Sequence, residues 1–158
     1  MIRSIAPLRV PLFGLILGAV VWLGAGRAGE LDQKAVGFLK PGDVKWVESK
    51  NGSSASAILY GDPTKEGLYI ELMKWHPHHN SMPHSHPHDR IITVLSGTWW
   101  KGTGKFDMDS TVPMMPGTVV TDYGNQLHYD GAKDGDCTLE IVGEGPATTT
   151  DAEEKNMP

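Results

Sequence analysis

Residues 84–97 read HSHPHDRIITVLSG, and this stretch decides how the whole chain is interpreted. Successive side chains of an extended strand point to opposite faces, so His84 and His86 share one face. Pro87 biases His86 towards extended backbone. The two backbone positions lie about 6.6 Å apart, and both imidazoles can reach one metal ion at about 2.1 Å. The stretch therefore predicts a pair of metal ligands on one strand.

A third ligand is expected from a different strand. Six of the seven histidines lie between His76 and His88, and only His128 lies beyond that cluster. We therefore predict that His84, His86 and His128 bind one ion. His88 shares the same face by parity, but on a straight strand its Cα would lie about 13 Å from that of His84. We place it at the mouth of the site, as an additional candidate ligand.

The rest of the chain consists of short β-type runs separated by glycine, proline and aspartate, with no long amphipathic helix. Gly97 and Gly117 follow residues suited to tight turns, and each is expected at a hairpin. Strands are predicted at residues 55–60, 68–75, 82–86, 90–95, 98–102, 112–115, 118–122, 127–130 and 137–142, with an edge strand at 44–47. So many short strands indicate an all-β sandwich or closed barrel.

This arrangement resembles the cupin family. Residues 84–97 are similar to the first cupin motif, and Pro116-Gly117 followed by His128 is similar to the second. The resemblance covers about residues 36–146 and extends to small single-domain bacterial cupins. It implies a cupin-type jelly-roll β-barrel of one domain, with the histidines inside the barrel. It also implies one divalent transition metal as cofactor, without deciding between Fe, Zn, Ni, Cu and Mn.

One position departs from the family's pattern. The first cupin motif usually carries a glutamate ligand shortly after its second histidine, where this chain has Arg90 and Ile91. A guanidinium about 6 Å from a divalent ion would repel it by about 5 kcal/mol at an effective dielectric of 20. Arg90 could point outward, pair with Asp89 or another carboxylate, or anchor an anionic substrate, or the site could hold no metal. Two residues near His128 are further candidate ligands: Asp130, through its carboxylate, and Gln126, through its neutral side-chain oxygen.

The first residues of the sequence are typical of an export signal. Arg3 and Arg9 precede an uncharged, mostly apolar run at 11–26, and small residues suited to cleavage follow at 26–28. The run is shorter than the roughly 20 residues of a spanning helix. We therefore expect a signal peptide at 1–28, a lead-in at 29–43, the barrel at 44–146 and a flexible tail at 147–158. The protein would be periplasmic or secreted, with no stable membrane insertion after cleavage.

The charge of the chain and its single cysteine exclude one class of partner and one kind of crosslink. The chain has 14 basic and 19 acidic side chains. The expected leader holds three of the arginines and no acid, so the mature chain would carry a net charge of −8, which argues against nucleic acid as partner. Cys137 is the only cysteine, so no intramolecular disulfide can form, and its alternating context predicts a buried apolar residue.

Three functions fit these residues. The first is a metal-dependent enzyme of the oxygenase type acting on a small organic molecule, in which three histidines leave coordination positions open and Arg90 pairs with a substrate carboxylate. Export counts against this function, because iron(II) is hard to keep reduced outside the cytoplasm. The second is a non-catalytic periplasmic metal- or small-ligand-binding protein, which the additional histidines and methionines favour. The third is a metal-supported isomerase or lyase. Cupins often form dimers, so the resemblance leaves a homodimer open.

Overall fold

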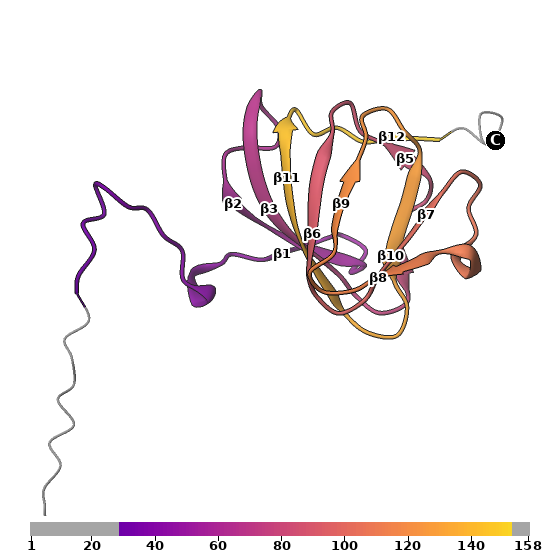
Figure 1. Cartoon of the computed structure of the whole chain (residues 1–158), viewed down its shortest axis with the longest axis horizontal. Coiled ribbons are helices and arrows are strands. Elements are labelled where there is room, and N and C mark those ends of the chain that lie inside the picture. Colours follow the sequence, from indigo (N-terminus) through magenta and orange to yellow (C-terminus); the bar gives the residue numbers. More distant parts are fainter. Residues whose placement is uncertain (1–28, 153–158) are drawn as a thin grey trace, which may run out of the picture. The chain divides into compact units, whose positions relative to one another are not determined.

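The computed structural model describes residues 29–152, so the expected signal peptide and residues 153–158 of the expected tail lie outside the described part. The chain divides into two units, of which the first ends at Gly37. In the described part of that unit, the backbone N–H groups of Ala35 and Val36 donate to the carbonyl of Asp32. The second unit, from Phe38 onward, contains the β-structure (Figure 1). Within residues 29–152, no helix has the length and apolarity of a membrane span.

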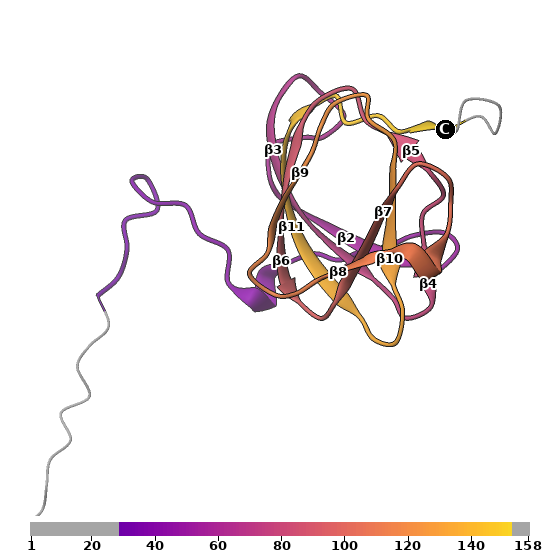
Figure 2. The same ribbon diagram turned by 45° about the vertical axis from the view of Figure 1, so that its right-hand side comes forward.

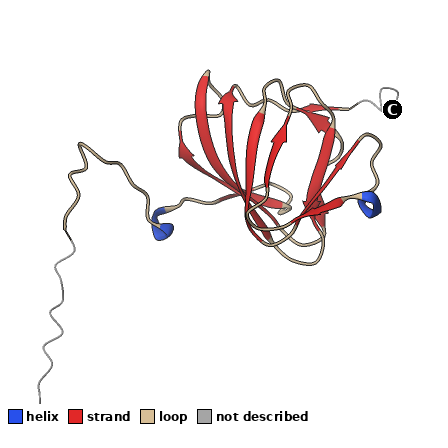
Figure 3. Ribbon diagram, in the orientation of Figure 1, coloured by secondary structure: helices blue, strands red, loops and turns tan. Residues whose placement is uncertain are grey.

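Two antiparallel sheets of six strands each build the second unit, and they face each other around a common interior (Figure 2). Strands account for nearly all of its regular structure (Figure 3). The first sheet has the order β1 (Val47–Glu48), β2 (Ser54–Tyr60), β3 (Gly67–Trp75), β11 (Cys137–Gly145), β6 (Arg90–Ser96), β9 (Val119–Asp122). The second has the order β12 (Thr150–Asp151), β5 (His84–Ser85), β10 (His128–Ala132), β7 (Trp99–Thr103), β8 (Val112–Met114), with β4 (His79–Asn80) also paired to β10. Two short 3-10 helices complete it, η1 (Pro41–Asp43) and η2 (Met108–Ser110).

The interior follows from strict alternation along the central strands. Every second residue of β11, starting from Cys137, is buried, and the residues between them are more exposed. This is the two-residue period of a strand with one face towards the core. The core cluster formed in this way contains Tyr69, Trp75, Ile92, Val94, Trp99, Ala132, Cys137, Leu139 and Ile141. Cys137 is fully buried, so the expectation of a buried apolar residue is confirmed, and burial raises the pKa of its thiol to about 12.

Both expected hairpin glycines occur at turns. Gly97 links β6 to β7 with φ +73°, and Gly117 links β8 to β9 with φ +88°. This left-handed backbone suits glycine because it has no Cβ. At Gly97 there is a second reason, since a Cβ there would collide with the carbonyl oxygen of Asp136.

Two segments outside the predicted strands contain strands. His79 lies between the predicted strands at 68–75 and 82–86, but it begins β4, which pairs with β10 through Asn80 and Gly131. Gly131 permits this, because a Cβ at that position would collide with the backbone of His79. Thr150–Asp151, within the segment expected as a flexible tail, form β12, which pairs with β5 and places Thr150 opposite Ser85. The sequence of this segment is polar, and its place depends on long-range backbone pairing that local composition does not reveal.

Candidate metal centre

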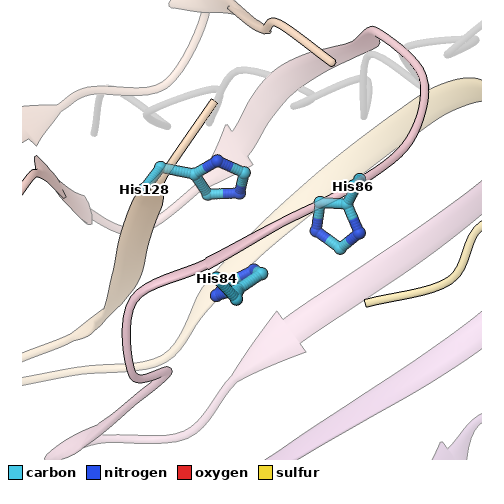
Figure 4. A group of neighbouring side chains, drawn as sticks. All are labelled: His84, His86 and His128. Carbon is cyan, nitrogen blue, oxygen red and sulfur yellow. The ribbon is translucent and has the colours of Figure 1, made fainter. Parts of the chain in front are cut away.

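Two neighbouring strands bring the three predicted histidines together. His84 on β5 pairs in register with His128 on β10, and His86 follows two residues after His84. The ring centroid of His84 lies 4.9 Å from that of His86 and 4.6 Å from that of His128. The ring centroids of His86 and His128 lie 5.4 Å apart. One ligand atom from each ring lies within 4.8 Å of the others (Figure 4). All three side chains are buried, so the geometry expected from the spacing is present.

Backbone carbonyls fix the orientation of all three imidazoles. Nδ1 of His84 lies 2.8 Å from the carbonyl of Met82, Nδ1 of His86 lies 2.9 Å from that of Thr148, and Nδ1 of His128 lies 3.1 Å from that of Gln126. A carbonyl accepts only, so each Nδ1 must carry the proton, and in a neutral ring the lone pair is then on Nε2. The Nε2 atom of His86 is buried and has no hydrogen-bond partner, whereas the buried Nε2 of His128 lies 3.3 Å from the carboxylate of Asp122.

The surroundings keep two of these rings neutral. Burial, assisted by the charge of Arg90, lowers the pKa of His86 to about 4. Burial, assisted by the charge of Lys101, lowers the pKa of His128 to about 4. Neutral imidazole is the form that binds a metal ion. Three imidazoles oriented by backbone carbonyls, with one ligand atom of each within 4.8 Å of the others, fit a divalent transition-metal ion, which would act there as a Lewis acid with open coordination positions.

Arg90, which stands where a glutamate ligand was expected, points into the barrel. Its side chain is 13% exposed, and its Nη2 lies 3.4 Å from Oδ2 of Asp122, the residue opposite it on β9. Asp122 also contacts Lys101, whose Nζ is 2.6 Å from Oδ1, and its Oδ2 lies 3.3 Å from Nε2 of His128. Burial acts to raise the pKa of Asp122, but the positive charges beside it outweigh burial and lower it. Asp122 thus supplies a negative charge beside the histidines, where the family's glutamate ligand is replaced by Arg90.

Two of the three additional candidate ligands, His88 and Asp130, lie outside the histidine group. His88 is exposed, and the Gln126 side chain is exposed while its backbone carbonyl accepts from His128. Asp130 is buried, but its Oδ1 accepts from the indole N–H groups of Trp75 at 2.9 Å and Trp99 at 3.1 Å. Asp130 therefore orders two core tryptophans beside the site.

A cavity of about 620 Å³ opens beside the centre, which is within the usual size range of small-molecule sites. Its lining includes His84, His86, Arg90 and Asp130, and also Glu71 of β3. A second cavity of about 520 Å³ lies on the β8 and β9 side, where His128, Lys101 and Asp122 line it. The sequence analysis missed Glu71 and Asp122. The parity of the two strands was the available signal, because side chains two residues apart on a strand point to the same face. Tyr69, two residues before Glu71, is in the core, and Val120, two residues before Asp122, packs against the core.

Comparison with solved structures assigns the fold. Rru_A2000 of Rhodospirillum rubrum, a cupin-2 domain, matches 77% of this chain and 82% of its own, with 16% identity and a TM-score of 0.61. The polyketide cyclase RemF of Streptomyces resistomycificus matches 78% of this chain and 89% of its own, with 16% identity and a TM-score of 0.64. DMSP lyase DddQ of Ruegeria pomeroyi matches 69% of this chain and 61% of its own, with 15% identity and a TM-score of 0.55.

The protein therefore has the cupin fold, in which three buried histidines form a candidate metal centre. No family model and no curated protein matches the sequence. The similarity to the solved structures is accordingly one of architecture.

Proposed function

We propose that the protein is a metal-dependent enzyme that acts on a small organic molecule at a mononuclear centre formed by His84, His86 and His128. One observation carries this proposal: all three Nδ1 atoms face backbone carbonyls, and one ligand atom of each ring lies within 4.8 Å of the others inside the barrel. A histidine that serves only packing has no need of this common orientation. The orientation is typical of metal-binding histidines, whose second nitrogen is held by a hydrogen bond.

The cavity beside the centre supports a small substrate. Arg90 is the residue we propose as substrate anchor, because it lines this cavity and, among residues 29–152, its recorded anionic partner is Asp122, at 3.4 Å from Nη2. A guanidinium suits a carboxylate, which it can bind through two parallel hydrogen bonds. Two of the solved structures of similar fold are named as enzymes, a polyketide cyclase and a DMSP lyase, which is consistent with catalysis in such a barrel.

Two reaction types remain for this centre. An oxygenase would use the open coordination positions, as the sequence led us to expect. An isomerase or lyase would need an acid–base group beside the substrate, and Glu71 in the cavity wall favours this second type. Oxygen uptake by iron-loaded protein, measured against a panel of small carboxylates, separates the two, because only the oxygenase consumes dioxygen. We further propose that the enzyme works outside the cytoplasm, as the basic and apolar start of the chain suggests.

Metal analysis tests the proposal. Protein purified without a histidine tag should contain about one transition-metal ion per chain, and His84→Ala should contain almost none. His88→Ala is the matched control, since this exposed histidine lies four residues away on the same segment and outside the group. Less than about a tenth of an ion per wild-type chain would reject the proposal. Full occupancy without turnover of any carboxylate would instead favour a binding protein.

A further inference from the structure

Glu71 is a carboxyl group that the fold does not use. It lies on the inward face of β3 and lines the cavity together with His84, His86 and Arg90. The residue opposite it on β11 is Ile141, which is buried in the apolar core. Within residues 29–152, Arg90 bonds to Asp122, and no hydrogen bond or ion pair ties Glu71 to another side chain. A glutamate facing a cavity without a structural partner is a candidate for chemistry.

The environment of Glu71 suits proton transfer. Burial raises the pKa of its carboxyl group, and the charge of Arg90 opposes that rise. The other ionisable groups facing the cavity are His84 of β5, His86 just after that strand, Asp130 of β10 and Asp151 of β12, while Tyr69 lies two residues away on β3. A carboxyl group that titrates closer to neutral pH than an ordinary glutamate can accept and return a proton efficiently.

We propose that Glu71 is the general base of the active site, and that the substrate is a small carboxylate with an acidic C–H bond next to a carbonyl or carboxyl carbon. This inference rests on the proposed function, because the metal would hold and polarise the same substrate. Arg90 supplies the preference for a carboxylate, since its guanidinium is a cation and Arg90 and Glu71 line one cavity.

The proposed step is redox neutral. The C–H bond breaks, its proton forms an O–H bond with the Glu71 carboxylate, and its electron pair remains on the substrate as an enolate. In an isomerase the proton returns to a different carbon atom. In a lyase the electron pair expels a leaving group from the neighbouring carbon. Neither course requires an oxidant or another reactant.

Hydrogen–deuterium exchange tests this step without knowledge of the natural substrate. Zinc-loaded protein is incubated in D₂O with pyruvate or malonate, and loss of the C–H signal is followed by proton NMR. We expect wild-type protein to accelerate exchange, and Glu71→Gln to slow the accelerated rate by about 10²–10⁴-fold. Arg90→Gln should raise the probe concentration needed for half-maximal rate at least tenfold. Glu140→Gln is the control, since Glu140 pairs with Leu72 and both lie on the opposite face of the sheet. This variant should catalyse exchange of the probe at the wild-type rate.

Two further measurements keep the inference falsifiable. In metal-free protein, carbon NMR of the Glu71 carboxyl should give a pKa above that of an ordinary glutamate, and Arg90→Gln should raise it further. Glu71→Gln should keep its zinc affinity within threefold of wild type. A tenfold loss of affinity would make Glu71 a metal ligand and overturn its role as base, as would wild-type exchange rates in Glu71→Gln. Zinc-loaded wild-type protein that exchanges neither probe would also overturn the inference, whereas failure to bind any metal would reject the proposed function itself.

Discussion

Replacement of Asp122 by asparagine tests the charge balance around the centre. The carboxylate lies 2.6 Å from Lys101 Nζ and 3.4 Å from Arg90 Nη2. At an effective dielectric of 20 these distances correspond to Coulomb attractions of about 6 and about 5 kcal/mol. Desolvation of the buried charges offsets most of this attraction, but removing one partner leaves the others buried and unpaired. We therefore expect Asp122→Asn to lower the free energy of unfolding by about 3–5 kcal/mol.

The assay is urea unfolding of metal-free protein at pH 7, followed by circular dichroism. Asp134→Asn removes an exposed carboxylate and should change stability by less than about 0.5 kcal/mol. Adding Lys101→Met to Asp122→Asn removes one unpaired cation and should recover part of the loss. A loss below about 1 kcal/mol in Asp122→Asn would refute the view that this carboxylate neutralises the two cations.

The same contacts predict a pH dependence. Because the pKa of Asp122 is lowered in the folded protein, its contribution to stability is present above the pKa of an ordinary aspartate, about 3.9, and is lost as the pH falls through the lowered value. The stabilities of wild type and Asp122→Asn should therefore converge in strong acid. A constant difference across the whole pH range would assign the loss to packing and not to charge.

Three other predictions follow from single contacts. Deleting residues 147–158 removes the carbonyl that orients His86, so zinc affinity should fall about 10–100-fold in calorimetric titration, and an unchanged affinity would contradict this positioning. The pKa of His76 is raised because the carboxylates of Glu48 and Asp136 bond its ring. Its contribution to the free energy of unfolding, a few tenths of a kcal/mol, should therefore be fully present below about pH 6.5 and lost as the pH rises through the raised value. The urea midpoints of His76→Gln should lack this pH dependence. Gly97→Ala should cost about 2–3 kcal/mol in thermal unfolding because of its positive φ and the collision at its Cβ, whereas Gly135→Ala, with open space around it, should be nearly neutral.

The strands and the histidine group were predictable because they depend on local rules. Alternation along β6 and β11, and the turn glycines Gly97 and Gly117 that follow β6 and β8, identify the hairpins of a barrel. The His-x-His pair shares a face by parity alone, and the position of His128 on the neighbouring strand follows once a barrel is assumed. Predicted strands differ from the observed ones mainly at their ends, as with the predicted run at 82–86, of which only His84–Ser85 is β5.

The charge network around Arg90 could not be predicted in the same way. Its partner Asp122 is 32 residues away in the chain and meets it only through the register of β6 with β9. The role of Asp130 likewise depends on two tryptophans from different strands, which occupy its Oδ1. Register over such separations is set by the packing of the whole barrel, which local sequence does not encode.

X-ray absorption of the zinc-loaded protein tests the central claim most directly, because it identifies the atoms bound to the metal. The structure predicts one ion bound by three imidazole nitrogens, from His84, His86 and His128, at about 2.0–2.1 Å. His128→Ala should reduce the imidazole count to two. A wild-type spectrum with sulfur ligands, or with fewer than three imidazoles, would contradict the three-histidine centre.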